Sequence, residues 1–350
     1  VVNISGLNAL PDDEIQLVAG INLTNAASVE INITGGDTVI QAMEAVNATT
    51  LDINSADAVT IQGDLPSDLA VIDASDVDGL FTATIAGVTQ AGVAEETRDG
   101  PFTFTGGDGG TVLFLEEFPE ASAQAHTIDG GTGGATLVIG GAGANPPVDL
   151  SLSTLNNISA VELKDSAILW LEMSDADAIG ASNFSLYEGA TAATLNLSGL
   201  NDEEFAKANY ADGISVGLLS IAAVPSVTLH PDTDLTDVGG LVVSDGTTLN
   251  LTAAQFQQLT NGGITAAASN NGAFTVNITD LTQADVEAGF DLSGIAAENL
   301  TVTLAEDVVF DLGTTIDFNG ADIDMGAFTL TLPSVALADA LNVTGTPGST

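Results

Sequence analysis

The chain has 350 residues, of which 45% are hydrophobic, and this is enough to bury a large core and to form two or three domains. It carries 48 acidic residues against three basic ones, Arg98, Lys164 and Lys207, so its formal net charge is −45 at pH 7. Because binding to phosphate groups depends on Lys and Arg, this balance excludes nucleic acid and anionic membranes as partners. The absence of cysteine excludes disulfides and thiolate metal sites.

The N-terminal region, residues 1–97, carries a repeat of about 20 residues. Each block contains two apolar clusters, and the first clusters of successive blocks align at 27–33, 48–53 and 69–72. Two or three short strands in a period of this length are typical of the stacked coils of a β-solenoid, which bury apolar side chains against the neighbouring coils. Asp37 and Asp57 occupy equivalent positions in successive blocks, at the turn between the two strands.

Residues 98–147 form a glycine-rich second region, in which 102–139 predict a glycine-dense hairpin. Residues 106–114 and 130–138 both resemble the calcium-binding nonapeptide of RTX proteins, Gly-Gly-x-Gly-x-Asp-x-aliphatic-x. The resemblance implies tight glycine turns, calcium bound by backbone carbonyls and the Asp carboxylate, and an aliphatic side chain that points inward.

Both copies depart from the RTX pattern at the Asp position, which is Thr111 in the first and Ala135 in the second. Asp108 and Asp129 are neighbouring carboxylates that can replace the missing ligands, because calcium requires only a cluster of oxygen atoms. The alternative is a glycine-rich turn that has kept its shape without its metal. The sequence leaves both interpretations open.

Residues 148–350 contain further β units, in which aliphatic residues alternate with Asn, Ser or Thr. The recurring tetrapeptides are Leu195–Ser198, Leu249–Thr252, Val276–Thr279, Leu300–Thr303 and Leu341–Thr344. This alternation places the aliphatic side chains on one face of a strand. Short helices follow some of these strands, with capping boxes at Thr252 with Gln255 and at Thr282 with Asp285.

These patterns predict an all-β fold, an irregular parallel β-solenoid with short helical insertions. Tandem β-sandwich modules are the alternative, because the later repeats are spaced unevenly. The longest apolar stretch, 214–229, is interrupted by Ser and Pro and falls short of the roughly 18 to 20 apolar residues of a membrane helix. We therefore expect buried strands there and no membrane insertion.

Acidic residues occur in groups that suit calcium, which takes roughly six to eight oxygen ligands. The candidate ligands are Asp37, Asp57, Asp73, Asp76, Asp78, Asp108 and Asp129. Further groups are Asp12–Glu14, then Asp232 with Asp234 and Asp237, and Asp317 with Asp322 and Asp324. A solvated acidic face is the simpler interpretation of any single group, but the net charge of the whole chain favours bound divalent cations.

Eleven of the 22 asparagines are followed by x-Ser or x-Thr. They are Asn3, Asn22, Asn32, Asn47, Asn157, Asn183, Asn196, Asn250, Asn277, Asn299 and Asn342. One explanation is glycosylation, for which Asn-x-Ser/Thr is the acceptor pattern. The other is geometric, since Asn and Thr two residues apart lie on the same polar face of a strand and pair across strands.

Residues 55–85 resemble surface-layer proteins and large adhesins exported by type I secretion. The resemblance rests on Ala-Asp-Ala-Val-Thr-Ile-Gln-Gly at 56–63 and on Val71–Ser75, and in looser form it covers about half of the chain. It implies secretion to an extracellular cell surface, calcium-dependent folding or lattice assembly, and anchoring by a part of the protein not present here.

Few residues suit catalysis, since His126 and His230 are the only histidines and there is no Walker loop. We predict a non-enzymatic structural protein that assembles with copies of itself into a lattice or filament, with calcium bridging its acidic faces. One alternative is an adhesin or fibre segment that binds a cell-surface polysaccharide. Another is a polysaccharide-active enzyme that uses paired carboxylates.

Overall fold

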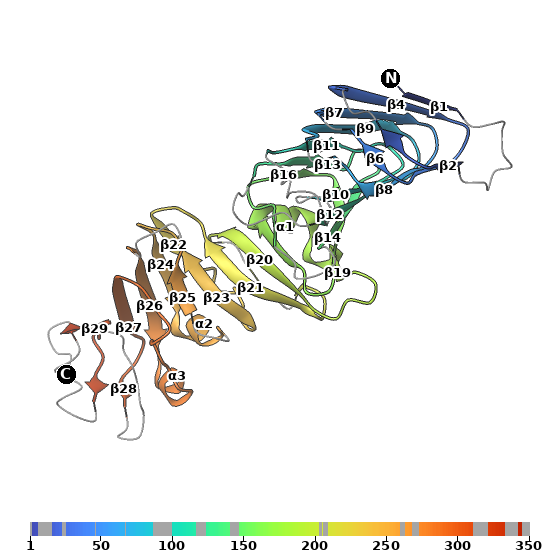
Figure 1. Ribbon diagram of the computed structural model, residues 1–350. Coiled ribbons are helices and arrows are strands. Elements are labelled where there is room, and N and C mark those ends of the chain that lie inside the picture. The colour runs from blue at the N-terminus through green and yellow to red at the C-terminus, as the bar shows by residue number, and fades with distance from the viewer. Residues whose placement is uncertain are drawn as a thin grey trace. The chain divides into compact units, whose positions relative to one another are not determined.

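The computed structural model shows a parallel β-solenoid of about 11 turns with short helices (Figure 1). It describes residues 2–5, 16–22, 26–45, 47–66, 68–86, 100–116, 124–140, 147–202, 205, 209–259, 263–267, 273–310, 321–332 and 342–344. The predicted parallel solenoid is therefore confirmed. The tandem-sandwich alternative is wrong, because the paired strands of both units run parallel, whereas a sandwich is built from antiparallel sheets.

The chain divides into two compact units. The first comprises Val1–Leu195 with Tyr210–Ile214, and the second comprises Asn196–Asn209 with Ser215–Thr350. The strand β20 (Ala193–Leu200) contains the division.

The first unit is built on two parallel sheets. One has the order β1 (Val2–Ser5), β4 (Ser28–Thr34), β7 (Thr50–Ser55), β9 (Val71–Val77), β11 (Thr103–Thr105), β13 (Thr127–Asp129) and β16 (Thr154–Asn156). The other has the order β19 (Phe184–Leu186), β17 (Ile158–Leu163), β14 (Ala135–Ile139), β12 (Thr111–Glu116), β10 (Phe81–Ala86), β8 (Val59–Asp64), β5 (Thr38–Ile40) and β2 (Gln16–Val18).

Smaller elements complete this unit. They are the pairs β3 (Ile21–Asn22) with β6 (Met43–Glu44) and β15 (Val148–Asp149) with β18 (Ile168–Glu172), the helix α1 (Met173–Ile179) and the 3₁₀ turn η1 (Ala181–Asn183).

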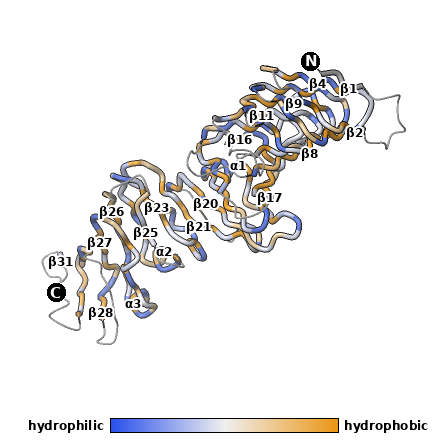
Figure 2. Tube along the Cα trace, viewed as in Figure 1, coloured by the Kyte–Doolittle hydropathy of each residue, from blue (hydrophilic) through white to orange (hydrophobic). Residues whose placement is uncertain are grey.

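The core of the first unit consists of apolar columns that run from coil to coil. The register places Val29, Leu51 and Ile72 opposite one another, and Phe104 and Ile128 continue the column. All five side chains are buried. Polar residues alternate with them along the strands, as the colours in Figure 2 show, and their partial exposure places them on the outer face.

The glycine-rich region forms coils of these same two sheets. β11 lies between β9 and β13, and β12 lies between β10 and β14, in parallel pairs. The hairpin predicted for residues 102–139 is wrong, because a hairpin requires antiparallel neighbours. The turns stack so closely that a Cβ atom on Gly107 would lie 2.1 Å from the Val77 carbonyl oxygen, so glycine is required there.

The second unit contains two further parallel sets. One is β21 (Ile214–Ile221), β23 (Val238–Val243) and β25 (Gly263–Ala266). The other is β22 (Ser226–Thr228), β24 (Thr248–Thr252), β26 (Thr275–Leu281), β27 (Asn299–Leu304), β29 (Asp322–Asp324) and β31 (Asn342–Thr344), beside the pair β28 (Val308–Val309) with β30 (Leu330–Thr331). The apolar stretch 214–229 thus forms strands, as predicted, and none of the described helices is long and apolar enough to cross a membrane.

Two short helices in this unit begin at the predicted capping boxes. In α2 (Ala253–Gln257) Thr252 caps Gln255, and in α3 (Gln283–Glu287) Thr282 caps Asp285, with both reciprocal hydrogen bonds present. The caps end each strand and turn the chain at a fixed residue, which is why strand and helix follow one another directly.

Candidate functional site

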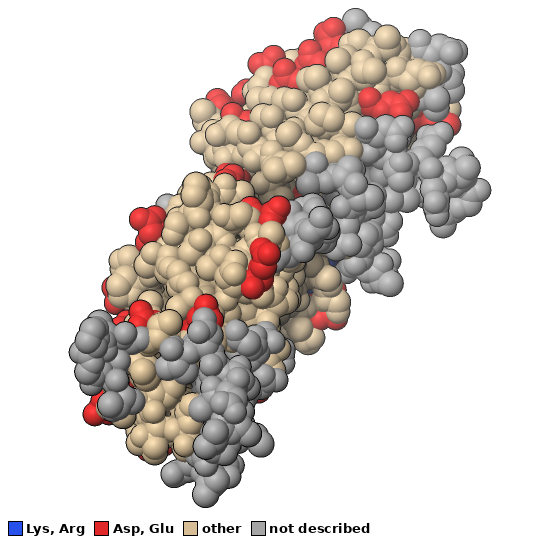
Figure 3. Space-filling model, turned by 90° about the vertical axis from the view of Figure 1, so that its left-hand side faces the viewer, with Lys and Arg blue, Asp and Glu red and all other residues tan. Residues whose placement is uncertain are grey.

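An outward column of carboxylates crosses the first unit. The register of β4, β7 and β9 places Glu30 opposite Asp52 and Asp52 opposite Asp73. Neighbouring strands lie about 4.8 Å apart, so these carboxylates follow one another at short, regular intervals. Thr105 and Asp129 continue the same column on β11 and β13. Figure 3 shows acidic side chains in small groups separated by uncharged surface.

The centre of this column is electrostatically strained. Partial burial raises the pKa of the Asp52 carboxyl, and the charges of Asp73, Glu30 and Asp76 raise it further. Asn54 offsets part of this effect by donating to Asp52 at 3.4 Å. A cation above the column would relieve the same repulsion.

Asp37 and Asp57 lie in successive turns and hold those turns together. The Asp57 carboxylate accepts a hydrogen bond from the Gly36 amide at 2.9 Å, and the Asp37 carboxylate accepts one from the Ala58 amide at 3.0 Å. Each acid therefore satisfies a backbone donor of the adjacent coil.

Asp73, Asp76 and Asp78 lie on or directly after β9. Asp73 accepts from the Ser75 amide at 3.0 Å, and Asp76 is opposite Asn54 of β7. Asp78 lies in the turn that follows, where its amide donates to the Ser55 carbonyl at 2.8 Å.

Asp108 and Asp129 bind neighbouring glycine turns. Asp108 accepts a hydrogen bond from the Thr132 hydroxyl. Asp129 accepts from the Gly131 amide at 2.9 Å and from the Asn157 side chain at 2.8 Å. These two acids thus connect successive turns.

Within the described ranges, no three His, Asp or Glu side chains are grouped so that they could hold a metal ion. Asp12–Glu14 and Asp317 lie outside the described residues. In the second unit, hydrogen bonds from the Thr236 side chain and amide lower the pKa of Asp234, while Asp322 and Asp324 face outward on β29.

The two histidines lie beside a phenylalanine ring and near a carboxylate. In the first unit His126 is buried against the Phe102 ring, with its Nδ1 accepting from the Phe102 amide at 3.2 Å. His230 belongs to the second unit, with Nδ1 3.8 Å from Asp232. Residues 213–217 match Gly-x-Ser-x-Gly, yet Ser215 lies within strand β21 and not on the strand-to-helix turn that a nucleophile elbow requires.

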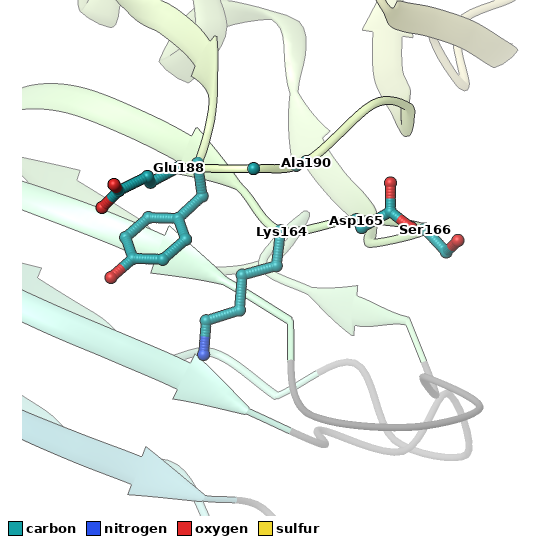
Figure 4. A pocket seen from close by; sticks show the side chains of 7 residues that line it. Lys164, Asp165, Ser166, Glu188 and Ala190 are labelled. Atoms are coloured by element: carbon teal, nitrogen blue, oxygen red, sulfur yellow. The ribbon is translucent and has the colours of Figure 1, made fainter.

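A surface hollow of about 420 Å³ lies between residues 164–166 and 187–190 of the first unit. Lys164 extends from it, away from Asp165 and Ser166 (Figure 4), and its ammonium group lies 2.5 Å from the Glu116 carboxylate. The same ammonium is 5.0 Å from the Phe114 ring and 5.9 Å from the Tyr187 ring. The cation is therefore already paired and covered by aromatic faces.

A second acidic group was not predicted from the sequence. Burial raises the pKa of Asp175 in α1 to about 6, with a further contribution from Glu172, and one Asp175 carboxylate oxygen is buried without a hydrogen-bond partner among the described residues. Burial also raises the pKa of Asp177 in the same helix. Burial and the Asp177 charge raise the pKa of Tyr210 to about 12. Only the folding of α1 onto the coil brings these groups together, so the linear sequence carries no signal for them.

Comparison with known proteins gave no match to a family model, to a curated protein or to a solved structure.

Proposed function

We propose that this chain is a non-catalytic structural subunit of an extracellular cell surface, which packs against copies of itself with calcium or a similar divalent cation between acidic faces. The observation that carries the proposal is the in-register column Glu30, Asp52 and Asp73 with its raised Asp52 pKa. A column of this kind repels a second copy of itself unless a cation lies between the two.

The supply of charge within the chain supports this proposal. Of the three basic residues only Lys164 lies in the described part, and it is paired with Glu116. The outward carboxylates therefore require cations from solution. Carboxylate oxygens are ligands that calcium prefers, and a face that supplies two or three of them is half of a site. The face of a second copy supplies the other half.

The proposal also agrees with the turn acids. Asp37, Asp57, Asp108 and Asp129 use carboxylate oxygens to bind adjacent coils, and each carboxylate has further lone pairs for a cation. These four residues therefore remain candidate calcium ligands, together with Asp73, Asp76 and Asp78. Each would supply only part of the coordination shell of the ion.

Calcium titration with electron microscopy and thermal unfolding tests the proposal. Calcium should produce ordered assemblies and raise Tm, and EDTA should reverse both effects. The double variant Asp52→Asn with Asp73→Asn removes both the repulsion and the cation ligands of the column, so its assembly should depend less on calcium than that of the wild type. The matched control, Glu287→Gln with Glu298→Gln, removes two exposed charges from the second unit and should assemble like the wild type. Assembly that is insensitive to EDTA would contradict the role of the cation.

The hollow beside Lys164 favours a second candidate, an adhesin segment that binds a cell-surface polysaccharide. Tyr187 offers a ring on which a sugar can stack, and Glu188 offers a carboxylate for hydroxyl groups. Binding of the isolated monomer to a glycan array, lost in Tyr187→Ala and kept in Asp52→Asn, would favour this function over self-assembly.

A further inference from the structure

The structure separates the eleven Asn-x-Ser/Thr sites by what their side chains do. Asn196 is buried, and its side-chain oxygen accepts from the Leu218 amide at 2.8 Å. Asn32 donates to Glu30 at 2.9 Å, Asn250 to Ser226 at 3.1 Å, and Asn277 to Asn250 at 2.8 Å. A sugar on the nitrogen of Asn32, Asn250 or Asn277 would remove a donor from the stacked strands, and Asn196 is buried.

Three more sites are exposed, but the side-chain nitrogen of each Asn already donates a hydrogen bond. Asn22 donates to Glu44 at 2.5 Å, Asn157 to Asp129 at 2.8 Å, and Asn183 to the Ile179 carbonyl at 2.6 Å. Asn299 is exposed at the start of β27, but it lies within that strand and is paired with Thr275 of β26. Asn3 and Asn342 lie in β1 and β31, and their side chains are outside the described part.

Asn47 differs from all of these. Asn47–Thr49 lies in a turn before β7, outside the described helices and strands, and both Asn47 and Thr49 are exposed. The Asn47 side chain makes no hydrogen bond to another described residue, while its backbone has φ 72° and its amide donates to Asp68 at 3.3 Å. Asn47 and Thr49 also line one surface hollow of about 380 Å³. The Thr49 hydroxyl donates to the Ala27 carbonyl at 3.2 Å, so it is the Asn47 side chain that the hollow leaves open.

We infer that Asn47 is an acceptor of an N-linked sugar in the folded chain. The reaction joins the Asn47 Nδ2 atom to the anomeric carbon of an activated sugar, breaks the bond from that carbon to the donor phosphate, and releases a proton from Nδ2 with the phosphate leaving group. The donor is a nucleotide sugar or a lipid-linked oligosaccharide, supplied with its transferase. This inference goes beyond the proposed self-assembly and does not depend on it.

The test uses the purified, folded chain, a nucleotide hexose and a soluble N-glycosyltransferase that recognises Asn-x-Ser/Thr. Peptide mass mapping after digestion at acidic residues gives the occupancy of each site. We expect at least a tenfold higher initial rate at Asn47 than at Asn250 and Asn277 in the folded chain. In urea-unfolded chain the three rates should approach one another.

Two variants complete the experiment. Asn47→Gln should remove the main modified peptide and leave the circular dichroism spectrum unchanged, and Asn250→Gln should leave the Asn47 rate unchanged. Equal rates at Asn47 and Asn250 in folded chain would overturn the inference. So would a folded chain unmodified at Asn47 whose unfolded form is modified there. Neither result bears on calcium-dependent assembly, which is measured separately.

Discussion

The strands of both units alternate buried apolar residues with outward polar ones, and the two units differ in the chemistry of these outward side chains. In the first unit the column contains Glu30, Asp52 and Asp73. In the second unit the corresponding column runs through Thr228, Asn250, Asn277 and Thr301 before it reaches a carboxylate at Asp322. Amides both donate and accept, so Asn277 donates to Asn250 and Asn250 donates to Thr228, whereas carboxylates only accept and repel one another. Neighbouring amides and hydroxyls of the second column are therefore hydrogen-bonded to one another, whereas neighbouring ionised carboxylates of the first column cannot bond to one another.

The turns of the two units differ as well. In the first unit the glycine turns stack so closely that a Cβ atom on Gly133 would lie 2.1 Å from the Gly110 nitrogen. In the second unit Gly246 has φ +73° and nothing within 4 Å of such an atom. Close stacking makes the glycine-rich turns around Gly107 and Gly133 sensitive to side-chain size, whereas Gly246, Gly289 and Gly326 of the second unit are constrained by backbone conformation and not by neighbouring atoms.

The largest expected effect is at these turns. Gly133→Ala should destabilise the first unit by about 3 kcal/mol or more, because the new methyl group clashes with backbone and not with a movable side chain. Gly246→Ala, the matched change in the second unit, should cost about 1 kcal/mol from its left-handed conformation alone. Urea unfolding measures both, with Trp170 fluorescence reporting the first unit, since it is the only tryptophan in the chain. Equal costs would contradict the close stacking.

Placing a charge among the amides of the second column should have the next largest effect. Asn277→Asp removes the donor to Asn250 and places a negative charge in the column, so it should cost about 1–3 kcal/mol at pH 7. Lowering the pH to protonate the new carboxyl should recover part of this loss. Asn299→Asp, which adds the same charge where no amide hydrogen bond is lost to another described residue, is the control and should cost less.

The third largest expected effect is on how the stability of each unit changes with pH. The pKa of Asp175 is about 6 in the folded chain and above its ordinary value, so its charged form opposes folding at pH 7. The first unit should therefore gain about 1–2 kcal/mol, after allowance for solvent screening, as the pH falls from 7 through 6 toward 4. In the second unit Asp234 has a lowered pKa, so its contribution is lost as the pH falls below its ordinary range. Trp170 fluorescence at each pH should show the gain, and Asp175→Asn should remove most of it.

The smallest expected effect is at Asp52. Asp52→Asn should stabilise the first unit at pH 7 by less than about 1 kcal/mol, because the site is largely open to solvent. Because the pKa of Asp52 is raised in the folded chain, protonation of this carboxyl stabilises the wild type as the pH falls. The variant has no carboxyl at this position and should not gain this stability. Added calcium should narrow the difference between the two proteins. A variant less stable than the wild type without calcium would contradict the repulsion described for this column.

The solenoid could be predicted from the sequence because equivalent positions of stacked coils carry the same type of residue, and this produces a repeat along the chain. The alignment of Val29 with Leu51 and Ile72 is visible as a period close to 20. The hairpin prediction failed because glycine turns are common to antiparallel hairpins and to parallel coils, and only the partner of each strand distinguishes them. The partners Val71 and Thr103 are 32 positions apart, and this longer spacing also hides the repeat at that point.

The outward column was predicted only in part. Asp73, Asp76 and Asp78 could be identified as a group because they are close in sequence. Glu30 and Asp52 become neighbours of Asp73 only through strand pairing. Aligning the blocks by their polar positions would have found them, since Ser28-Val-Glu30 and Thr50-Leu-Asp52 match residue for residue. The group around Asp175 depends on how α1 packs, and no local pattern encodes it.

Pairing between adjacent coils has a consequence for how a chain of this kind changes length in evolution. Val29 is opposite Leu51 and Leu51 is opposite Ile72, so deleting the coil that carries Leu51 would bring Val29 opposite Ile72, an equally good apolar partner. Duplication or loss of whole coils is thus tolerated. A shift of one residue in strand register is not, because it would move the apolar side chains of that strand from the core to the solvent face. We expect related chains to differ in length by multiples of one coil.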